Sequence, residues 1–92
     1  MPVNSDERRL LLARARELPA RALVGKAGLT EAVVQQLRSL FVKTELIKLR
    51  LPKDRAAAGE LVGQIEREVP CECVGRMGFT GVFFRGSDTR QS

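Results

Sequence analysis

Hydrophobic positions along the chain follow a helical period in three segments, the first from residue 5 to about residue 18. The apolar stripe of this segment consists of Leu11, Ala15 and Leu18. Asn4 or Ser5 has the side chain of a helix N-cap, and Pro19 cannot continue a helix. The pattern predicts a first helix with one buried side, while its arginines cover the exposed side.

The second and third helical segments lie in the middle of the chain. One begins at Thr30, runs to about residue 42, and carries the apolar stripe Val33, Val34, Leu37, Leu40 and Phe41. The other begins at Asp54, ends before Pro70, and carries the stripe Ala58, Leu61, Val62, Ile65 and Val69. Because Gly59 and Gly63 lie one turn apart, they predict a neighbouring element that packs closely on this third helix.

Four segments have the signals of strands: residues 21–24, 45–51, 71–77 and 80–85. In the second of them, alternation places Ile47, Leu49 and Leu51 on one face and Lys48 and Arg50 on the other. This alternation predicts a strand with one basic face. A tight turn at Gly78 and Phe79 joins the last two strands into a hairpin.

The order of elements is helix, strand, helix, strand, helix, strand, strand, which predicts an α/β fold in a single compact domain. Each strand-helix-strand unit favours parallel pairing of its two strands, and the final hairpin adds an antiparallel strand. We expect a mixed four-stranded sheet packed by helices. The domain should span residues 5–86, after an N-terminal extension of residues 1–4 and before a flexible tail of residues 87–92.

Composition and charge limit the classes of function that are expected for this chain. The chain has 92 residues, a formal net charge of +5 and no histidine. The missing histidine removes the commonest general base and a frequent metal ligand, so neither an enzyme nor a cofactor is expected. The apolar runs are too short for a membrane span, and the acidic start of the chain differs from a secretory signal, so we expect a cytoplasmic protein without a membrane partner.

The two cysteines, Cys71 and Cys73, are separated by one residue. On a strand both side chains would lie on one face, where a disulfide between them would be strained. The spacing differs from the Cys-x-x-Cys of redox sites, and the chain lacks further soft ligands for zinc. We interpret both cysteines as packing residues.

The segment Gly25-Lys26-Ala27-Gly28 connects a strand to the helix that begins at Thr30. Glycines let a backbone approach a ligand closely, and a helix N-terminus presents unpaired N–H groups, so such a turn suits a phosphate. The motif is neither a Walker A loop nor a dinucleotide fingerprint. Many strand-to-helix turns use glycine only to reverse direction, so the motif needs support from its surroundings.

That support is positive charge near the loop. Residues 1–28 contain six basic and three acidic residues, and residues 43–55 contain five basic and two acidic residues. The basic residues expected to adjoin the loop are Arg21, Lys26, Lys43, Lys48 and Arg50. Glycine loops of the Gly-x-x-Gly type combine close backbone approach with positive charge to hold successive nucleotides, which makes RNA the expected ligand class.

Three motifs in this order make the sequence recognisable. They are Gly25-Lys26-Ala27-Gly28-Leu29-Thr30, Glu45-Leu46-Ile47-Lys48-Leu49-Arg50 and Gly78-Phe79-Thr80-Gly81-Val82-Phe83-Phe84-Arg85. Over about residues 6–86 the chain resembles a CRM domain (chloroplast RNA splicing and ribosome maturation) in its stand-alone bacterial YhbY-like form. The resemblance implies a fold like that of the carboxyl-terminal domain of translation initiation factor three. It also implies binding of ribosomal RNA in precursors of the large ribosomal subunit during assembly.

Carried over by position, the resemblance implies an RNA site that contains Gly25, Lys26, Ala27, Gly28, Lys48 and Arg85. The basic residues near the loop add Arg21, Lys43 and Arg50 to the predicted site, and the start of the following helix adds Thr30. The chain departs from the family pattern in three places. Phe79 stands where a basic residue is frequent, Phe84 stands where tyrosine is common, and Pro70 lies near a usual glycine. Phe79 is therefore either a hydrophobic turn packed on the sheet or a base-stacking residue. The positions of Phe83 and Phe84, on opposite faces of their strand, favour core or helix-covering roles over the alternative of base stacking.

A second function class remains open at this point. The first helix and the phenylalanines of the hairpin together form an apolar surface that suits a ribosomal protein or an assembly factor. In that case contact with RNA is incidental. Under either hypothesis we expect a monomer that binds RNA or a ribosome-associated protein rather than a small molecule.

Overall fold

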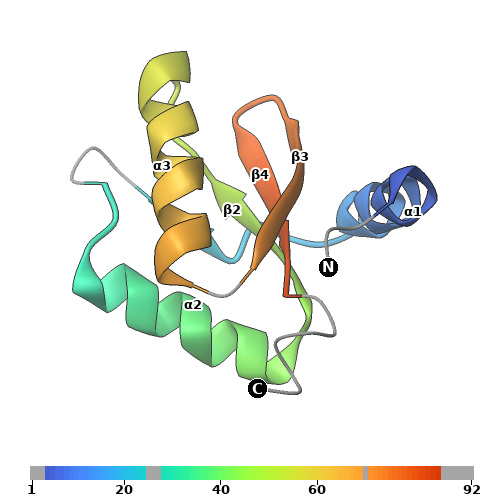
Figure 1. The fold of residues 1–92 in the computed structure, drawn as a ribbon, viewed down its shortest axis with the longest axis horizontal. Helices are drawn as coiled ribbons and strands as arrows, with labels where there is room; N and C mark the ends of the chain where they lie inside the picture. The colour runs from blue at the N-terminus through green and yellow to red at the C-terminus, as the bar shows by residue number, and fades with distance from the viewer. Residues whose placement is uncertain (1–3, 25–27, 70, 86–92) are drawn as a thin grey trace.

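The structure is a computed structural model that describes residues 4–24, 28–69 and 71–85. Three helices and four strands follow the predicted order (Figure 1). Their bounds are α1 Ser5–Ala15, β1 Ala22–Leu23, α2 Glu31–Lys43, β2 Leu46–Arg50, α3 Arg55–Glu68, β3 Glu72–Met77 and β4 Thr80–Phe84. None of the helices in these ranges is long and apolar enough to cross a membrane. The predicted tail over residues 87–92 lies outside the described residues.

The four strands form one sheet in the order β1-β2-β4-β3. The two-residue β1 pairs parallel with β2, as predicted, while β2, β4 and β3 form an antiparallel set. The expected parallel pairing of the strands on either side of α3 is wrong in one respect. β2 and β3 run in the same direction, but β4 lies between them and pairs with both.

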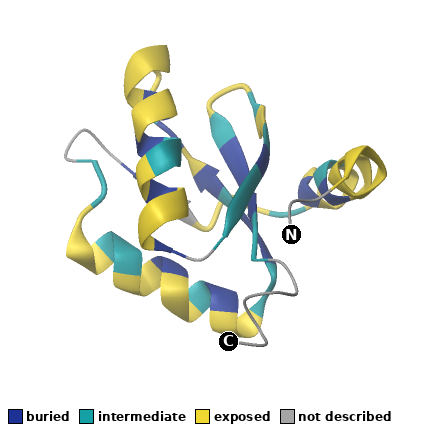
Figure 2. Ribbon diagram, in the orientation of Figure 1, coloured by how far each residue is buried: buried dark blue, intermediate teal, exposed yellow. Residues whose placement is uncertain are grey.

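The helices cover both faces of the sheet. Figure 1 shows α2 and α3 on one side of the strands and α1 on the other. Around α2 and α3 the larger core includes Leu37, Phe41, Ile47, Leu49, Leu61, Ile65 and Phe83. Under α1 a smaller core contains Leu11, Ala15, Leu46, Val74 and Val82, with Phe84 packed against it. Buried residues follow this layering (Figure 2), and Phe83 and Phe84 face opposite sides of the sheet as predicted.

Each helix begins at a predicted cap. At α1 the Asn4 side chain accepts a hydrogen bond from the Glu7 N–H (2.8 Å), and the Glu7 carboxylate accepts one from the Asn4 N–H (3.3 Å). This reciprocal pair is a capping box. Thr30 and Asp54 cap α2 and α3 through one hydrogen bond each, of 3.3 Å and 3.0 Å. These bonds satisfy N–H groups that a helix cannot satisfy itself.

Two local expectations are corrected. The first helix ends at Ala15 rather than near residue 18, because Glu17 and Leu18 donate to carbonyls three residues back and form tighter turns. Gly59 and Gly63 were expected to mark close packing on α3. A Cβ atom built on either glycine meets nothing within 4 Å, so no neighbour requires a glycine there.

Candidate nucleic-acid interface

The glycine loop joins β1 to α2. Its first three predicted residues, Gly25, Lys26 and Ala27, lie outside the described residues. Gly28 has a φ of +78°, a left-handed conformation that glycine adopts without strain, and a Cβ there would have open space. Gly28 is therefore required for its backbone conformation. The predicted site residue Thr30 follows, and its hydroxyl caps the start of α2.

Lys48 does not lie on an open basic face of β2. The face of β2 that carries Lys48 also carries Leu46, which is buried under α1. The half-buried Lys48 donates hydrogen bonds from its Nζ to the carbonyl oxygens of Ala15 (3.2 Å) and Leu18 (3.1 Å). Its ammonium thus satisfies acceptors at the C-terminal end of α1, where a positive charge is also favoured by the helix dipole. The expected free basic face is corrected to a face partly covered by a helix.

Arg85 has an equivalent place at the end of α2. Its Nη1 donates to the carbonyl oxygen of Phe41 in the last turn of that helix, and its own N–H donates to the Glu45 carbonyl at 2.8 Å. At the end of α3, Arg38 donates from Nη2 to the Glu68 carbonyl at 3.0 Å. In the described ranges, each helix therefore has a carbonyl group at its C-terminal end that accepts a hydrogen bond from a basic side chain outside that helix. Two of these basic residues, Lys48 and Arg85, belong to the motifs from which the RNA site was predicted.

The predicted arginines Arg21 and Arg50 are both exposed and lie near each other. The Arg21 N–H donates to the Lys48 carbonyl (2.8 Å), and Leu23 pairs with Arg50. This register places Arg21 and Arg50 on the same face of adjacent strands, offset by two residues. Lys43, by contrast, ends α2, whose 13 residues extend about 20 Å from the loop. The structure brings Arg21 and Arg50 together and leaves Lys43 at the other end of the domain.

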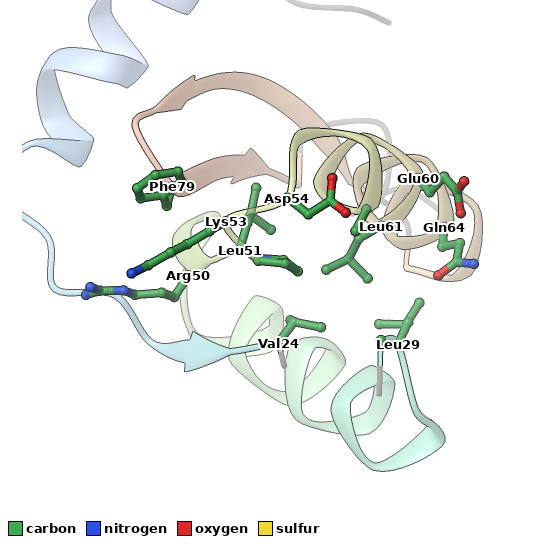
Figure 3. Close-up of a pocket in the computed structure, with 13 residues that line it drawn as sticks. Val24, Leu29, Arg50, Leu51, Lys53, Asp54, Glu60, Leu61, Gln64 and Phe79 are labelled. Atoms are coloured by element: carbon green, nitrogen blue, oxygen red, sulfur yellow. The ribbon is translucent and has the colours of Figure 1, made fainter. Parts of the chain in front are cut away.

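A groove of about 830 Å³ opens beside the carboxyl end of β1 (Figure 3). Its apolar floor comprises Val24, Leu29, Leu51 and Leu61. In Figure 3 the nitrogen ends of Arg50 and Lys53 lie toward Phe79 at one end, while Glu60 and Gln64 lie at the other. Val24, directly before the glycine loop, and Gly28, the last residue of the loop, both contribute to the groove. The groove thus combines an apolar base with cations at one end and, at the other, the carboxylate of Glu60 and the amide of Gln64.

Sequence reasoning missed Lys53 as a site residue and left Phe79 undecided. The signal for Lys53 was its place in the basic segment 43–55, directly after the strand-ending Pro52. The signal for Phe79 was its departure from the family pattern. What brings both to the groove is a long-range hydrogen bond from the Leu51 N–H to the Phe79 carbonyl (2.7 Å), which joins the hairpin turn to the end of β2.

The cysteines lie away from the groove at the edge strand β3. Both are free and half-buried, and they pack against the larger core. Burial, with a smaller effect of the Glu66 carboxylate, raises the pKa of Cys71 from 9.0 to about 12. Burial also raises the pKa of Cys73, whose N–H donates to Glu66 at 2.8 Å. Thiols with raised pKa values are protonated at neutral pH and are therefore poor nucleophiles.

Comparison with known proteins agrees with this architecture. The solution structure of a Staphylococcus aureus protein, described as a candidate RNA-binding protein, superposes with a TM-score of 0.82 at 23% sequence identity. The match covers 94% of this chain and 91% of the other, and it shows that the two share a fold. No curated protein matched the chain. The family model of the CRS1/YhbY (CRM) domain matches residues 3–85, and the chain therefore belongs to that family.

Proposed function

We propose that the protein is a non-catalytic RNA-binding protein that binds ribosomal RNA in precursors of the large ribosomal subunit during assembly. Family membership and the description of the S. aureus relative as a candidate RNA-binding protein both support RNA as the ligand. The observation that carries the proposal is that Val24 and Gly28 of the strand-to-helix turn line the same groove as the exposed Arg50 and Lys53. Arg21 lies near Arg50 on the adjacent strand.

The chemistry of this region suits a polyanion. Arg21, Arg50 and Lys53 are exposed, and no ion pair joins any of them to another described residue. Their charges are therefore available for phosphates. The capped N-terminus of α2 begins at Thr30, two residues after Gly28, and its dipole adds positive potential near the end of the groove that Leu29 lines. An apolar floor next to these cations accommodates a base while phosphates remain at the rim.

Lys48 and Arg85 have a different proposed role from that of Arg50, because they support the fold. Their side chains hold the C-terminal ends of α1, which precedes β1, and α2, which follows the loop, and neither side chain lines the groove. We expect their replacement to lower RNA affinity chiefly by loosening the fold. Lys26 and Arg21 remain proposed phosphate contacts, and Lys43 is a peripheral one.

The proposal is tested by binding a fluorescent ribosomal RNA fragment over a series of salt concentrations. Neutralising about five phosphates gives a slope of log affinity against log salt of about −3.5 to −4.5. The double variant Arg21→Glu and Arg50→Glu should bind much more weakly and with a shallower slope. A control with the same change in net charge, Arg9→Glu and Arg67→Glu, alters exposed arginines on α1 and α3 outside the groove. Equal loss of affinity in the two variants would contradict the proposed surface.

A second candidate function rests on a different surface. Leu10 is 66% exposed and, with Phe84, lines an apolar hollow between α1 and the sheet. Such a surface suits a ribosomal protein or an assembly factor, with RNA contact incidental. Replacing Leu10 with serine separates the two functions. A protein partner bound at this hollow should remain bound to the wild type after nuclease treatment. The Leu10→Ser variant should lose that partner and keep the RNA affinity of the wild type.

A further inference from the structure

Phe79 differs from the other phenylalanines of the chain in being open to solvent. Phe41 and Phe83 are buried and Phe84 packs under α1, but Phe79 is 52% exposed. It is also the only aromatic among the exposed large hydrophobic residues of the described ranges. About half of the Phe79 surface is therefore open to solvent and does not pack back on the sheet.

The backbone holds Phe79 in a fixed place. Met77 pairs with Thr80, so Gly78 and Phe79 alone form the hairpin turn. Gly78 has a φ of +61° and Phe79 has no positive φ, the pattern of a turn with glycine at its first central position. The hydrogen bond from the Leu51 N–H to the Phe79 carbonyl ties the turn to β2. An aromatic ring on such an anchored turn loses little conformational entropy on binding.

Four basic residues lie around this ring. Phe79 contributes both to the 830 Å³ groove, which Arg50 and Lys53 also line, and to a second hollow of about 360 Å³, which Lys53, Arg55 and Arg76 line. The four basic residues are exposed, and none forms an ion pair within the described parts of the chain. An exposed ring with cations on two sides matches the way proteins bind single-stranded nucleic acids, by stacking and by phosphate contacts.

We propose that Phe79 stacks on an unpaired base of RNA while Arg50 and Lys53 on one side, and Arg55 and Arg76 on the other, bind the flanking phosphates. This inference rests on the proposed function and names the state of the RNA. In an RNA duplex the faces of the bases are covered by their neighbours, so the ring has nothing to stack on. The site therefore selects single-stranded or looped RNA.

A second copy of this chain is a poorer occupant of the same surface. Self-association through the turn would bring two sets of four basic side chains together, in a protein whose net charge is already +5. Like charges brought together in an interface weaken association strongly. RNA, by contrast, supplies both the aromatic partner and the opposite charge.

The absence of tryptophan and tyrosine from the chain makes a direct test possible. The variant Phe79→Trp carries a single tryptophan at the proposed stacking position. Its fluorescence should be quenched by a short unstructured RNA strand and much less by the same sequence in a duplex. The matched control is Val42→Trp, because Val42 is 81% exposed at the far end of α2. Equal quenching of the two tryptophans, or equal quenching by strand and duplex, overturns the proposal.

Affinity gives a second readout. Phe79→Leu keeps an apolar side chain and removes the ring, so affinity for the single strand should fall by about 5-fold to 150-fold. Affinity for the duplex should be unchanged, and Phe79→Tyr should restore binding of the strand. A loss shared equally by strand and duplex would indicate a packing role and overturn the inference, as would dimers that Phe79→Leu dissociates.

The two proposals fail in distinguishable ways. If the wild type binds RNA with the predicted salt slope and Phe79→Leu binds equally well, stacking is wrong and the proposed function stands. If the wild type binds neither strand nor duplex, the proposed function fails and the inference fails with it.

Discussion

Replacing Lys48 with methionine tests whether this motif lysine supports the fold or faces the ligand. The ammonium of Lys48 donates to two carbonyl oxygens at the end of α1 while the alkyl stem passes through a half-buried region. Methionine keeps an unbranched apolar stem of similar size and removes the charge. The Ala15 and Leu18 carbonyls then lose their donor, and the helix end loses a favourable charge.

The magnitude follows from these two losses. A hydrogen bond from a charged donor contributes about 1.5–3 kcal/mol, and a cation at a helix C-terminus contributes about 0.3–1 kcal/mol when exposed. Because Lys48 is only half-buried, water replaces part of the lost bonding. We therefore expect the free energy of unfolding to fall by about 2–3 kcal/mol in total. For a domain of this size that corresponds to a decrease in Tm of about 10–20 °C.

Urea unfolding and thermal unfolding followed by circular dichroism measure this effect directly. The control is Arg50→Met, two residues along the same face of β2, because Arg50 is exposed and makes no hydrogen bond through its side chain with another described residue. Its stability should change by less than about 0.5 kcal/mol. Below the unfolding transition, Arg50→Met should lose more RNA affinity than Lys48→Met. A Lys48→Met protein as stable as the wild type would refute the capping role.

Four further predictions concern other parts of the molecule. Gly78→Ala forces a left-handed backbone on a residue with a Cβ and should destabilise the domain by about 1–2 kcal/mol in urea unfolding, with poorer hairpin formation seen by NMR. Gly59→Ala meets nothing within 4 Å and should stabilise α3 by about 0.5–1 kcal/mol, so a destabilised variant would show that a neighbour does pack there. The thiols of Cys71 and Cys73 should react with iodoacetamide at pH 8 far more slowly in the folded than in the unfolded protein, because burial raises both pKa values. As the unfolded chain releases these protons near pH 9 and folded Cys71 holds its proton to about pH 12, stability should fall as pH rises through that range.

Local sequence signals predicted most of the fold because those signals act within a few residues. Asn4, Thr30 and Asp54 cap their helices as expected, and the turn at Gly78 and Phe79 joins the last two strands. The position of β4 between β2 and β3 was not predicted. The sequence order favours pairing of strands that flank a helix, whereas the observed sheet places the hairpin partner of β3 between them. Strand order is a long-range property that no local pattern contains.

The positive charge of the candidate site was predictable from the sequence. Which basic residues support the fold and which face the ligand was not. Lys48 and Arg50 lie two residues apart, so the sequence predicts that both project from the same face of the strand. The structure separates them because α1 covers the sheet as far as Lys48 and leaves Arg50 open. Arg85 is similarly drawn to the end of α2. Phe79 gains its four basic neighbours only when the end of β2, the start of α3 and the hairpin turn meet.

Sedimentation of the tagged protein from its native lysate on sucrose gradients, at low and at high salt, tests the central claim most directly. Binding to ribosomal RNA of the large-subunit precursor predicts that the wild type migrates with those particles at low salt and leaves them at high salt. The Arg21→Glu and Arg50→Glu variant should stay at the top of the gradient, while the Arg9→Glu and Arg67→Glu control should migrate with the particles. Wild-type protein confined to the top of the gradient at low salt would contradict the account.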